Sequence, residues 1–206
     1  MIQQIKNLPA EKRRAVTVQA VIKLAEEWNP YDITTSAIAA MMGLTQGALF
    51  RHFLSKDVIW NSVMEWVRSC LLVRIDQAIQ SAKSPLAALE AIFMAHLDFV
   101  SRHPGVPRIL LTELQRTGTT PAKQLAQEFL TEYEQRLCRL IETGKTFGEI
   151  TPYVSTESAT ALFVGTIQGL AVQSIVKDSQ KQILSQAAEI FSLYRRGIEV
   201  RHETSA

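Results

Sequence analysis

Cysteine is scarce in this 206-residue chain, and other absences narrow its possible functions further. Two cysteines are too few for a disulfide framework, and the N-terminal residues contain no apolar run of signal-peptide length, so a cytoplasmic protein is expected. The sequence contains no glycine-rich phosphate loop, no HExxH and no CxxC motif, and its four histidines are not paired at metal-ligand spacing. We therefore expect no enzyme activity, no cofactor and no metal site.

The composition is that of a folded protein. Hydrophobic residues make up 47% of the chain and charged residues 20%, which argues against disorder. The 22 Lys and Arg against 20 Asp and Glu give a formal net charge of +2, which neither proves nor excludes a nucleic-acid partner. A chain of this length can form one large domain, or a small domain joined to a larger one.

One uncharged stretch, residues 159–176, approaches the length of a membrane span. It contains Gln168 and Gln173, whose amides would be costly in lipid without partners. A helix that is buried on all sides fits these residues better than a membrane span. No membrane association is expected.

Apolar residues recur at helical spacing in almost every segment, and no run alternates with the period of a strand. The sequence therefore predicts an all-α fold of about nine helices. Proline, glycine and capping residues mark their ends. The predicted helices cover residues 11–28, 35–42, 45–52, 56–81, 85–102, 106–115, 121–143, 159–176 (with a cap at 155 or 156) and 180–199.

The second and third predicted helices have the spacing of a helix-turn-helix. Thr34 or Thr35 can cap the first of them, and Thr45 can cap the second. Ala39 is small enough for a close helix crossing, and Gly43 tolerates the positive φ that the turn requires. The small core between the two helices is predicted to consist of Ile38, Leu44 and Leu49.

The second helix of such a motif enters the major groove with its N-terminal residues against base edges. Gln46 is the best candidate for base readout, because its amide can both donate to and accept from an adenine edge. Backbone N–H groups at the caps and the basic side chains that follow can meet phosphates, with Lys12, Arg13 and Arg14 adding charge at the flank. The predicted DNA-binding residues are Thr34, Thr35, Thr45, Gln46, Gly47, Ala48, Phe50, Arg51, His52 and Lys56.

Two short helices around small residues also occur as plain helical corners, without any role in DNA binding. Charge does not decide between the two interpretations. Residues 1–57 hold seven Lys and Arg against five Asp and Glu, a net charge of +2, which is weak electrostatic steering.

The segment TTSAIAAMMGLTQGALFRHFLSKDVI resembles the DNA-binding domain of the TetR/AcrR family of bacterial repressors, within about residues 14–59. The matching features, in order, are a threonine four residues before the Ile38-Ala39 pair, Gly43, Leu49, the aromatic Phe50, Phe53, and Ser55-Lys56 before a long helix. Two positions depart from the family pattern. Phe50 stands where tyrosine is common, so a hydroxyl contact to phosphate is not carried over, and Pro30 replaces a pattern around a glycine.

The resemblance implies a helix-turn-helix DNA-binding domain at residues 1–55 and a larger helical domain for effector binding and dimerisation at residues 56–206. It further implies a homodimeric repressor that binds a roughly palindromic operator and is released by a small hydrophobic effector. The alternative is a helical DNA-binding protein without an effector, acting architecturally or in chromosome organisation.

The last two helices are predicted to form a four-helix dimer interface. Gly165 and Gly169 permit close helix approach, and pairing the two helices leaves a face for a second copy, although burial within a monomer is the alternative. The predicted interface residues are Phe163, Gly165, Gly169, Ile183, Ala187, Ile190 and Tyr194. The predicted effector pocket, whose members could equally be core residues, comprises Trp66, Cys70, Phe93, His96, Phe99, Leu110, Tyr133, Phe163 and Gln168.

Overall fold

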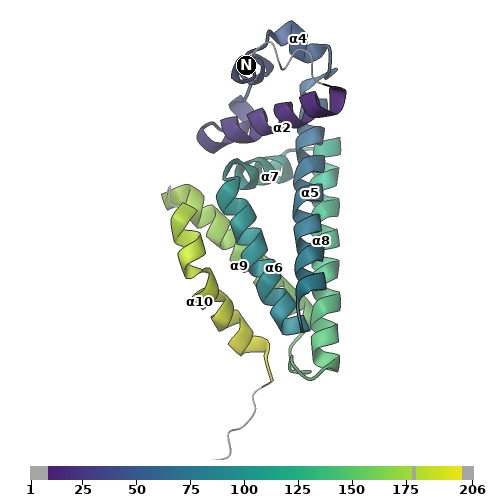
Figure 1. Ribbon diagram of the computed structural model, residues 1–206, viewed down its shortest axis with the longest axis vertical. Coiled ribbons are helices and arrows are strands. Elements are labelled where there is room, and N and C mark those ends of the chain that lie inside the picture. Colours follow the sequence, from purple (N-terminus) through teal and green to yellow (C-terminus); the bar gives the residue numbers. More distant parts are fainter. Residues whose placement is uncertain (1–8, 178–179, 201–206) are drawn as a thin grey trace, which may run out of the picture. The chain divides into compact units, whose positions relative to one another are not determined.

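The fold is all-α, as predicted, in the computed structural model, which describes residues 9–177 and 180–200 (Figure 1). Nine α-helices and one 3-10 helix, with no strand, account for the regular structure of these residues. The helices are α2 (Ala10–Glu27), η1 (Pro30–Asp32), α3 (Thr35–Met41), α4 (Gln46–Phe50), α5 (Lys56–Ser81), α6 (Pro85–Arg102), α7 (Gly105–Gln115), α8 (Pro121–Thr146), α9 (Thr156–Lys177) and α10 (Gln180–Ile198).

The chain folds into two compact units. The first unit is formed by the described residues up to Cys70 and by His103–Phe129, and the second by Leu71–Arg102 and the described residues from Leu130 onward. Helices α5 and α8 therefore contribute to both units. The predicted boundary between residues 55 and 56 separates the expected DNA-binding function from the expected effector-binding function. It is not a boundary between the two compact units, and it remains a prediction.

In the first unit, α2 packs against α3 and α7 (Figure 1). The buried face of α2 includes Val18, Ile22 and Ala25, whereas Ala15, at the same helical spacing, is exposed. Gly105 begins α7 at the point of closest approach, because a Cβ atom at this position would lie 2.2 Å from the backbone oxygen of Ile22. Only glycine allows the two backbones to come this close.

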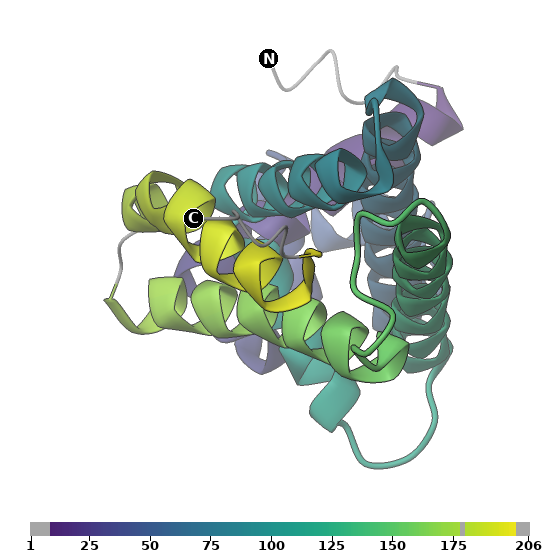
Figure 2. The ribbon, with the colours of Figure 1, turned by 90° about the horizontal axis from the view of Figure 1, so that it is seen from below.

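In the second unit, α10 packs against α6 and α9, and α6 packs against α9 (Figure 2). An aromatic cluster joins the three helices. The Phe93 ring lies 5.6 Å from that of Phe163 and 5.5 Å from that of Phe191, and the Tyr194 ring lies 5.4 Å from that of Phe163. The Tyr194 hydroxyl donates to the backbone oxygen of Ala159 at 3.2 Å, which satisfies this buried polar group.

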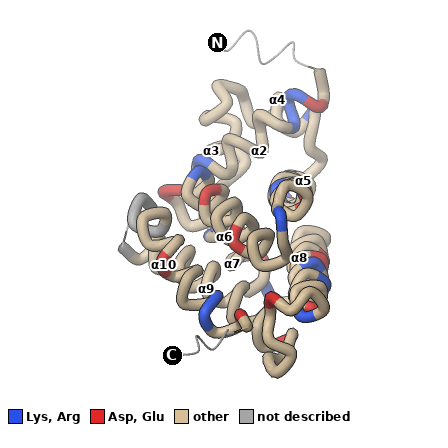
Figure 3. The backbone as a smooth tube through the Cα atoms, turned by 60° about the horizontal axis from the view of Figure 1, so that its bottom comes forward, with Lys and Arg blue, Asp and Glu red and all other residues tan. Residues whose placement is uncertain are grey.

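Helix α9 is buried on one face only. Among the described residues, it is the one helix long and apolar enough to cross a membrane by length and composition. Ile167 and Leu170 are buried, whereas Leu162 is 57% and Val176 is 78% exposed. The helix has no charged residue between Glu157 and Lys177 and is drawn in one colour there (Figure 3). The expectation of burial on all sides is therefore wrong for the single chain.

Three helices differ in detail from expectation. Helix α4 ends at Phe50, before Arg51 and His52. The spacing of Ile59, Val63, Trp66 and Cys70 would place Val73 on the buried face of α5, but Val73 is 54% exposed, because a strict seven-residue repeat drifts around a straight helix and the buried face passes to Leu71 and Ile75. Helix α8 continues to Thr146, past Gly144, and ends before Gly148, which has a φ of 73°.

Candidate DNA-binding site

Both short helices of the predicted motif begin at a threonine cap. The Thr34 hydroxyl accepts from the backbone N–H of Ala37 at 3.1 Å, so Thr34, and not Thr35, caps α3. The Thr45 hydroxyl accepts from the backbone N–H of Ala48 at 3.2 Å and caps α4. These bonds fix where each helix starts.

The turn between the helices is set by Gly43, whose φ is 66°. Its N–H donates to the Ala40 oxygen at 2.9 Å, and the N–H of Leu44 donates to the Ala39 oxygen at 2.8 Å. Ala39 and Leu49 are buried together with Ile38, and Leu44 is half-buried. The helix-turn-helix core is therefore formed by the residues that the sequence indicated.

The opposite face of α4 is open to solvent. Gln46 and Gly47 are exposed, Ala48 is half-buried and the Phe50 side chain is 39% exposed. The Gln46 amide nitrogen donates to the Thr35 hydroxyl at 2.7 Å, which holds this side chain against the start of α3. A Cβ atom on Gly47 would meet nothing within 4 Å, so the surface at this point is empty in the free protein.

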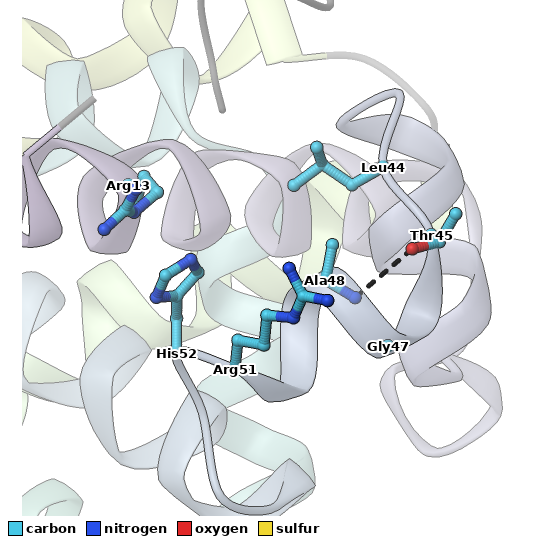
Figure 4. Close-up of a pocket in the computed structure, with 7 residues that line it drawn as sticks. All are labelled: Arg13, Leu44, Thr45, Gly47, Ala48, Arg51 and His52. Carbon is cyan, nitrogen blue, oxygen red and sulfur yellow. Dashed lines mark hydrogen bonds between the residues drawn. The ribbon is translucent and has the colours of Figure 1, made fainter. Parts of the chain in front are cut away.

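Three basic side chains surround a hollow beside α4 (Figure 4). Arg13 reaches it from α2, and Arg51 and His52 reach it from the turn that follows α4. The hollow encloses about 440 Å³, far more than the ~30 Å³ of one water molecule. Leu44, Thr45, Gly47 and Ala48 complete its lining.

The environment of His52 favours the neutral form of its imidazole ring. Burial lowers the pKa of His52 below its ordinary value, and the positive charges of Arg13 and Arg51 lower this pKa further. Because a neutral imidazole carries no charge, the electrostatic repulsion among Arg13, Arg51 and His52 is reduced in the free protein.

Lys56 lies in a different hollow of the same unit. Its ammonium group donates to the backbone oxygen of Tyr31 at 3.3 Å and lies 5.8 Å from the centre of the Trp60 ring. Burial lowers the pKa of Lys56, as does the charge of Arg116. The structure thus does not bring Lys56 together with Arg51 and His52, although sequence grouped all three as phosphate contacts.

The residues predicted to line an effector pocket are distributed over both units. In the first unit, Trp66, Cys70 and Leu110 are half-buried, and the Trp66 ring meets His103 edge-on at 5.1 Å. In the second unit, Phe93 and Phe163 belong to the aromatic cluster, and Phe99 is covered by the guanidinium group of Arg74 at 5.2 Å.

The polar residues of the predicted effector pocket lie in different environments. His96 Nδ1 and the Tyr133 hydroxyl are hydrogen-bonded at 3.1 Å. Burial lowers the pKa of His96 to about 4 and raises that of Tyr133, so both groups are neutral at pH 7. His96 nevertheless retains partial exposure. Gln168 is exposed on α9, on the other side of the helix from Phe163, and does not join them.

The predicted dimer residues also divide between two faces. Phe163, Ala187 and Tyr194 are buried within the chain, and Ile190 is half-buried. Gly165 and Gly169 are exposed. The side chain of Ile183 lies outside the described residues.

Several residues of these sites have no clear signal in the sequence. Arg13 was noted only as flanking charge, yet it lines the hollow beside α4. Arg74 and Phe191 were absent from the predicted pocket, although they contact its members. Helical periodicity places a residue on a face but does not say which distant helix that face meets.

Comparison with known proteins places this geometry in a family. Residues 68–197, more than half of the chain, match a TetR C-terminal family described as YsiA-like protein, C-terminal region. The chain belongs to the TetR family. It is therefore a DNA-binding regulator, as the N-terminal motif indicated.

Several TetR-family relatives share the name nucleoid occlusion factor SlmA. The protein from Marinomonas sp. (strain MWYL1) is 25% identical over 157 residues, covering 76% of this chain and 80% of that protein. The one from Alteromonas mediterranea is 32% identical over 148 residues, covering 68% and 75%. The one from Idiomarina loihiensis is 35% identical over 98 residues, so this chain spans about half of its length.

Solved TetR-like structures share the fold at low sequence identity. The fatty acid degradation regulator FadR from Bacillus halodurans has a TM-score of 0.80 and 18% identity, covering 96% of this chain and 99% of that one. KstR2, the ketosteroid transcriptional regulator of Mycobacterium tuberculosis, has a TM-score of 0.78 and 18% identity, covering 92% and 96%. FadR from Bacillus subtilis, in complex with stearoyl-CoA, has a TM-score of 0.75 and 19% identity, covering 90% and 99%.

Among the described residues, no group of three or more His, Cys, Asp or Glu side chains is arranged to hold a metal ion. Cys70 and Cys138 are not joined in a disulfide bond.

Proposed function

We propose that this TetR-family protein is a cytoplasmic, homodimeric repressor without enzymatic activity, which binds a roughly palindromic operator and leaves it when a small hydrophobic effector binds. The observation that supports DNA reading most strongly is the open face of α4. Its first residues, Gln46 and Gly47, project from a helix whose other side is fixed by Leu49 and by the Thr45 cap. A helix held in this way can enter the major groove without rearrangement.

Base readout is assigned to Gln46 and backbone contact to the basic residues after α4. The Gln46 amide can leave Thr35 and form two hydrogen bonds with an adenine edge, and Gly47 lets the helix approach closely. Thr34, Thr35, Thr45, Phe50, Arg51, His52 and Lys56 are the proposed sugar and phosphate contacts, with Ala48 against a thymine methyl. Selection of bound duplexes from a random library tests this assignment.

The proposed dimer interface uses the bare face of α9. Leu162, Gly165, Gly169, Val172 and Val176 are exposed there in the single chain. A second copy would cover this face with its own α9 and α10. Sedimentation at micromolar concentration should show a dimer for the wild type and a monomer for Leu162→Asp, whereas Glu157→Gln, at the first turn of the same helix, should remain dimeric. A monomeric wild type would exclude this interface.

The proposed effector site lies around the predicted pocket residues. In the second unit, the neutral His96–Tyr133 pair places a few polar groups among apolar residues such as Phe93 and Phe99, which is typical of ligand sites. Long-chain acyl-CoA thioesters are the first compounds to test, because one structural relative was solved with stearoyl-CoA. Tryptophan fluorescence should change when the effector binds, and both this change and the release of DNA should be weaker in Tyr133→Phe, which lacks the hydroxyl bonded to His96. Failure of a broad hydrophobic library to do either would exclude an effector.

The relatives' name supports a second candidate, an effector-independent DNA-binding protein that acts in chromosome organisation. The two proposals differ in a measurable way. An effector-controlled repressor should occupy few chromosomal sites and lose them when its compound is added. A nucleoid-associated factor should occupy many dispersed sites and be insensitive to small hydrophobic compounds. Mapping of occupied sites in cells separates them.

A further inference from the structure

The hollow beside α4 has a charge arrangement that suits one anion. Arg13, Arg51 and His52 converge on it from segments that are far apart in the sequence (Figure 4). Its remaining lining, Leu44, Thr45, Gly47 and Ala48, carries no charge. The hollow borders the face of α4 that is proposed to meet DNA, so a phosphodiester of the duplex is the anion within reach.

The histidine in this cluster is poised to respond to that anion. The charged side chains that act on its ring are Arg13 from α2 and Arg51 from the turn after α4. Both arginines, and the desolvation of the ring, favour neutral imidazole in the free protein. A phosphate placed among the three groups reverses the sign of the local field and favours imidazolium.

We propose that Arg13, Arg51 and His52 hold one backbone phosphate of the duplex, and that His52 takes up a proton when this phosphate enters. The proton comes from solvent and binds the unprotonated ring nitrogen, and no other bond is made or broken. This inference rests on the proposed DNA-binding role of α4. It adds Arg13 to the DNA contacts and couples binding to pH.

The coupling has a defined sign. Because the pKa of His52 is lowered in the free protein and raised by a bound phosphate, DNA affinity increases as the pH falls through the interval between the two pKa values. Uptake of one proton at each phosphate site raises the DNA affinity by at most about tenfold for each unit by which the pH falls. Backbone phosphates stay ionised over this range, so the duplex does not contribute.

The test measures affinity for a mixed-sequence duplex by fluorescence anisotropy from pH 5.5 to 8.5 at constant ionic strength. Since phosphate contacts act on all sequences, no operator is needed. The wild type should bind more tightly as the pH falls. His52→Arg should bind tightly with a flatter profile, and His52→Gln should bind weakly with a flat profile. Arg13→Gln should bind more weakly, with its pH-dependent interval moved upward because one of the charges opposing imidazolium is gone.

A control histidine separates this effect from other titrations. His103 packs edge-on against Trp66, outside the helix-turn-helix, and His103→Gln should keep the wild-type profile. Circular dichroism at each pH confirms that every variant is folded. DNA binding by the wild type with the same pH profile as His52→Gln would overturn the proton coupling while leaving the proposed function intact. No binding to any duplex at any pH would instead refute the proposed function.

Discussion

The approach of α7 to α2 can be tested by one added methyl group. In Gly105→Ala, the new Cβ would lie 2.2 Å from the Ile22 backbone oxygen and 3.1 Å from the Ala25 Cβ. Ordinary van der Waals contact begins near 3.4 Å, so the two backbones must separate by about 1 Å. The oxygen belongs to a helix backbone and cannot rotate away as a side chain could.

Overpacking of this kind costs about 1–3 kcal/mol of unfolding free energy. For a chain of this size, each 1 kcal/mol lowers Tm by roughly 2–4 °C, so we expect a fall of several degrees in thermal unfolding followed by circular dichroism. Gly197→Ala is the matched control, because a Cβ on this helical glycine meets nothing within 4 Å and alanine favours a helix by about 1 kcal/mol. A Tm for Gly105→Ala equal to or above that of the wild type would contradict the observed contact.

Four further substitutions test the sites. Gln46→Ala should lower affinity by about 1–3 kcal/mol and relax preference at one base pair, and an equal loss on all sequences would refute base readout. Arg51→Ala should weaken binding to every duplex and reduce the slope of log affinity against log salt concentration by about one. Lys56→Ala should have the smaller effect, because its ammonium group is bonded to the Tyr31 carbonyl. A larger effect of Lys56→Ala than of Arg51→Ala in a salt titration would contradict this. Since the pKa of His96 is about 4 when folded and 6.5 otherwise, the unfolded chain binds more protons between these values, and unfolding free energy from urea titrations should rise with pH from 4 to 6.5. His96→Gln should show a smaller rise, and an identical rise would argue against a neutral, buried His96.

Helix positions followed from local signals in the sequence. Thr34, Gly43 and Thr45 act through bonds and torsions within a few residues, which is why the helix-turn-helix was predicted with its core. The end of α8 was harder to predict from the sequence. Gly144 lies within the helix, where glycine suits the close contact with Ile150 because a Cβ atom would lie 2.6 Å from that side chain. This contact depends on a loop whose path the sequence does not specify.

Contacts between distant segments escaped prediction. Arg13 joins Arg51 and His52 only because α2 crosses the motif, and Lys56 turns to Tyr31 because η1 brings that carbonyl close. On α9, the uncharged sequence indicated burial, but it did not distinguish the face that packs on α6 and α10 from the face left bare. The sequence pattern shows which residues of each helix are apolar, whereas the packing between helices determines which of them are buried.

Selection of bound duplexes from a random library, followed by the same selection with Gln46→Ala, tests the central claim most directly. If α4 reads DNA, the wild type enriches a palindrome with half-sites about one helical turn apart or a multiple of it, and the variant loses preference at one position of each half-site. Recovery of all sequences alike by the wild type, or an unchanged motif with Gln46→Ala, would contradict the account.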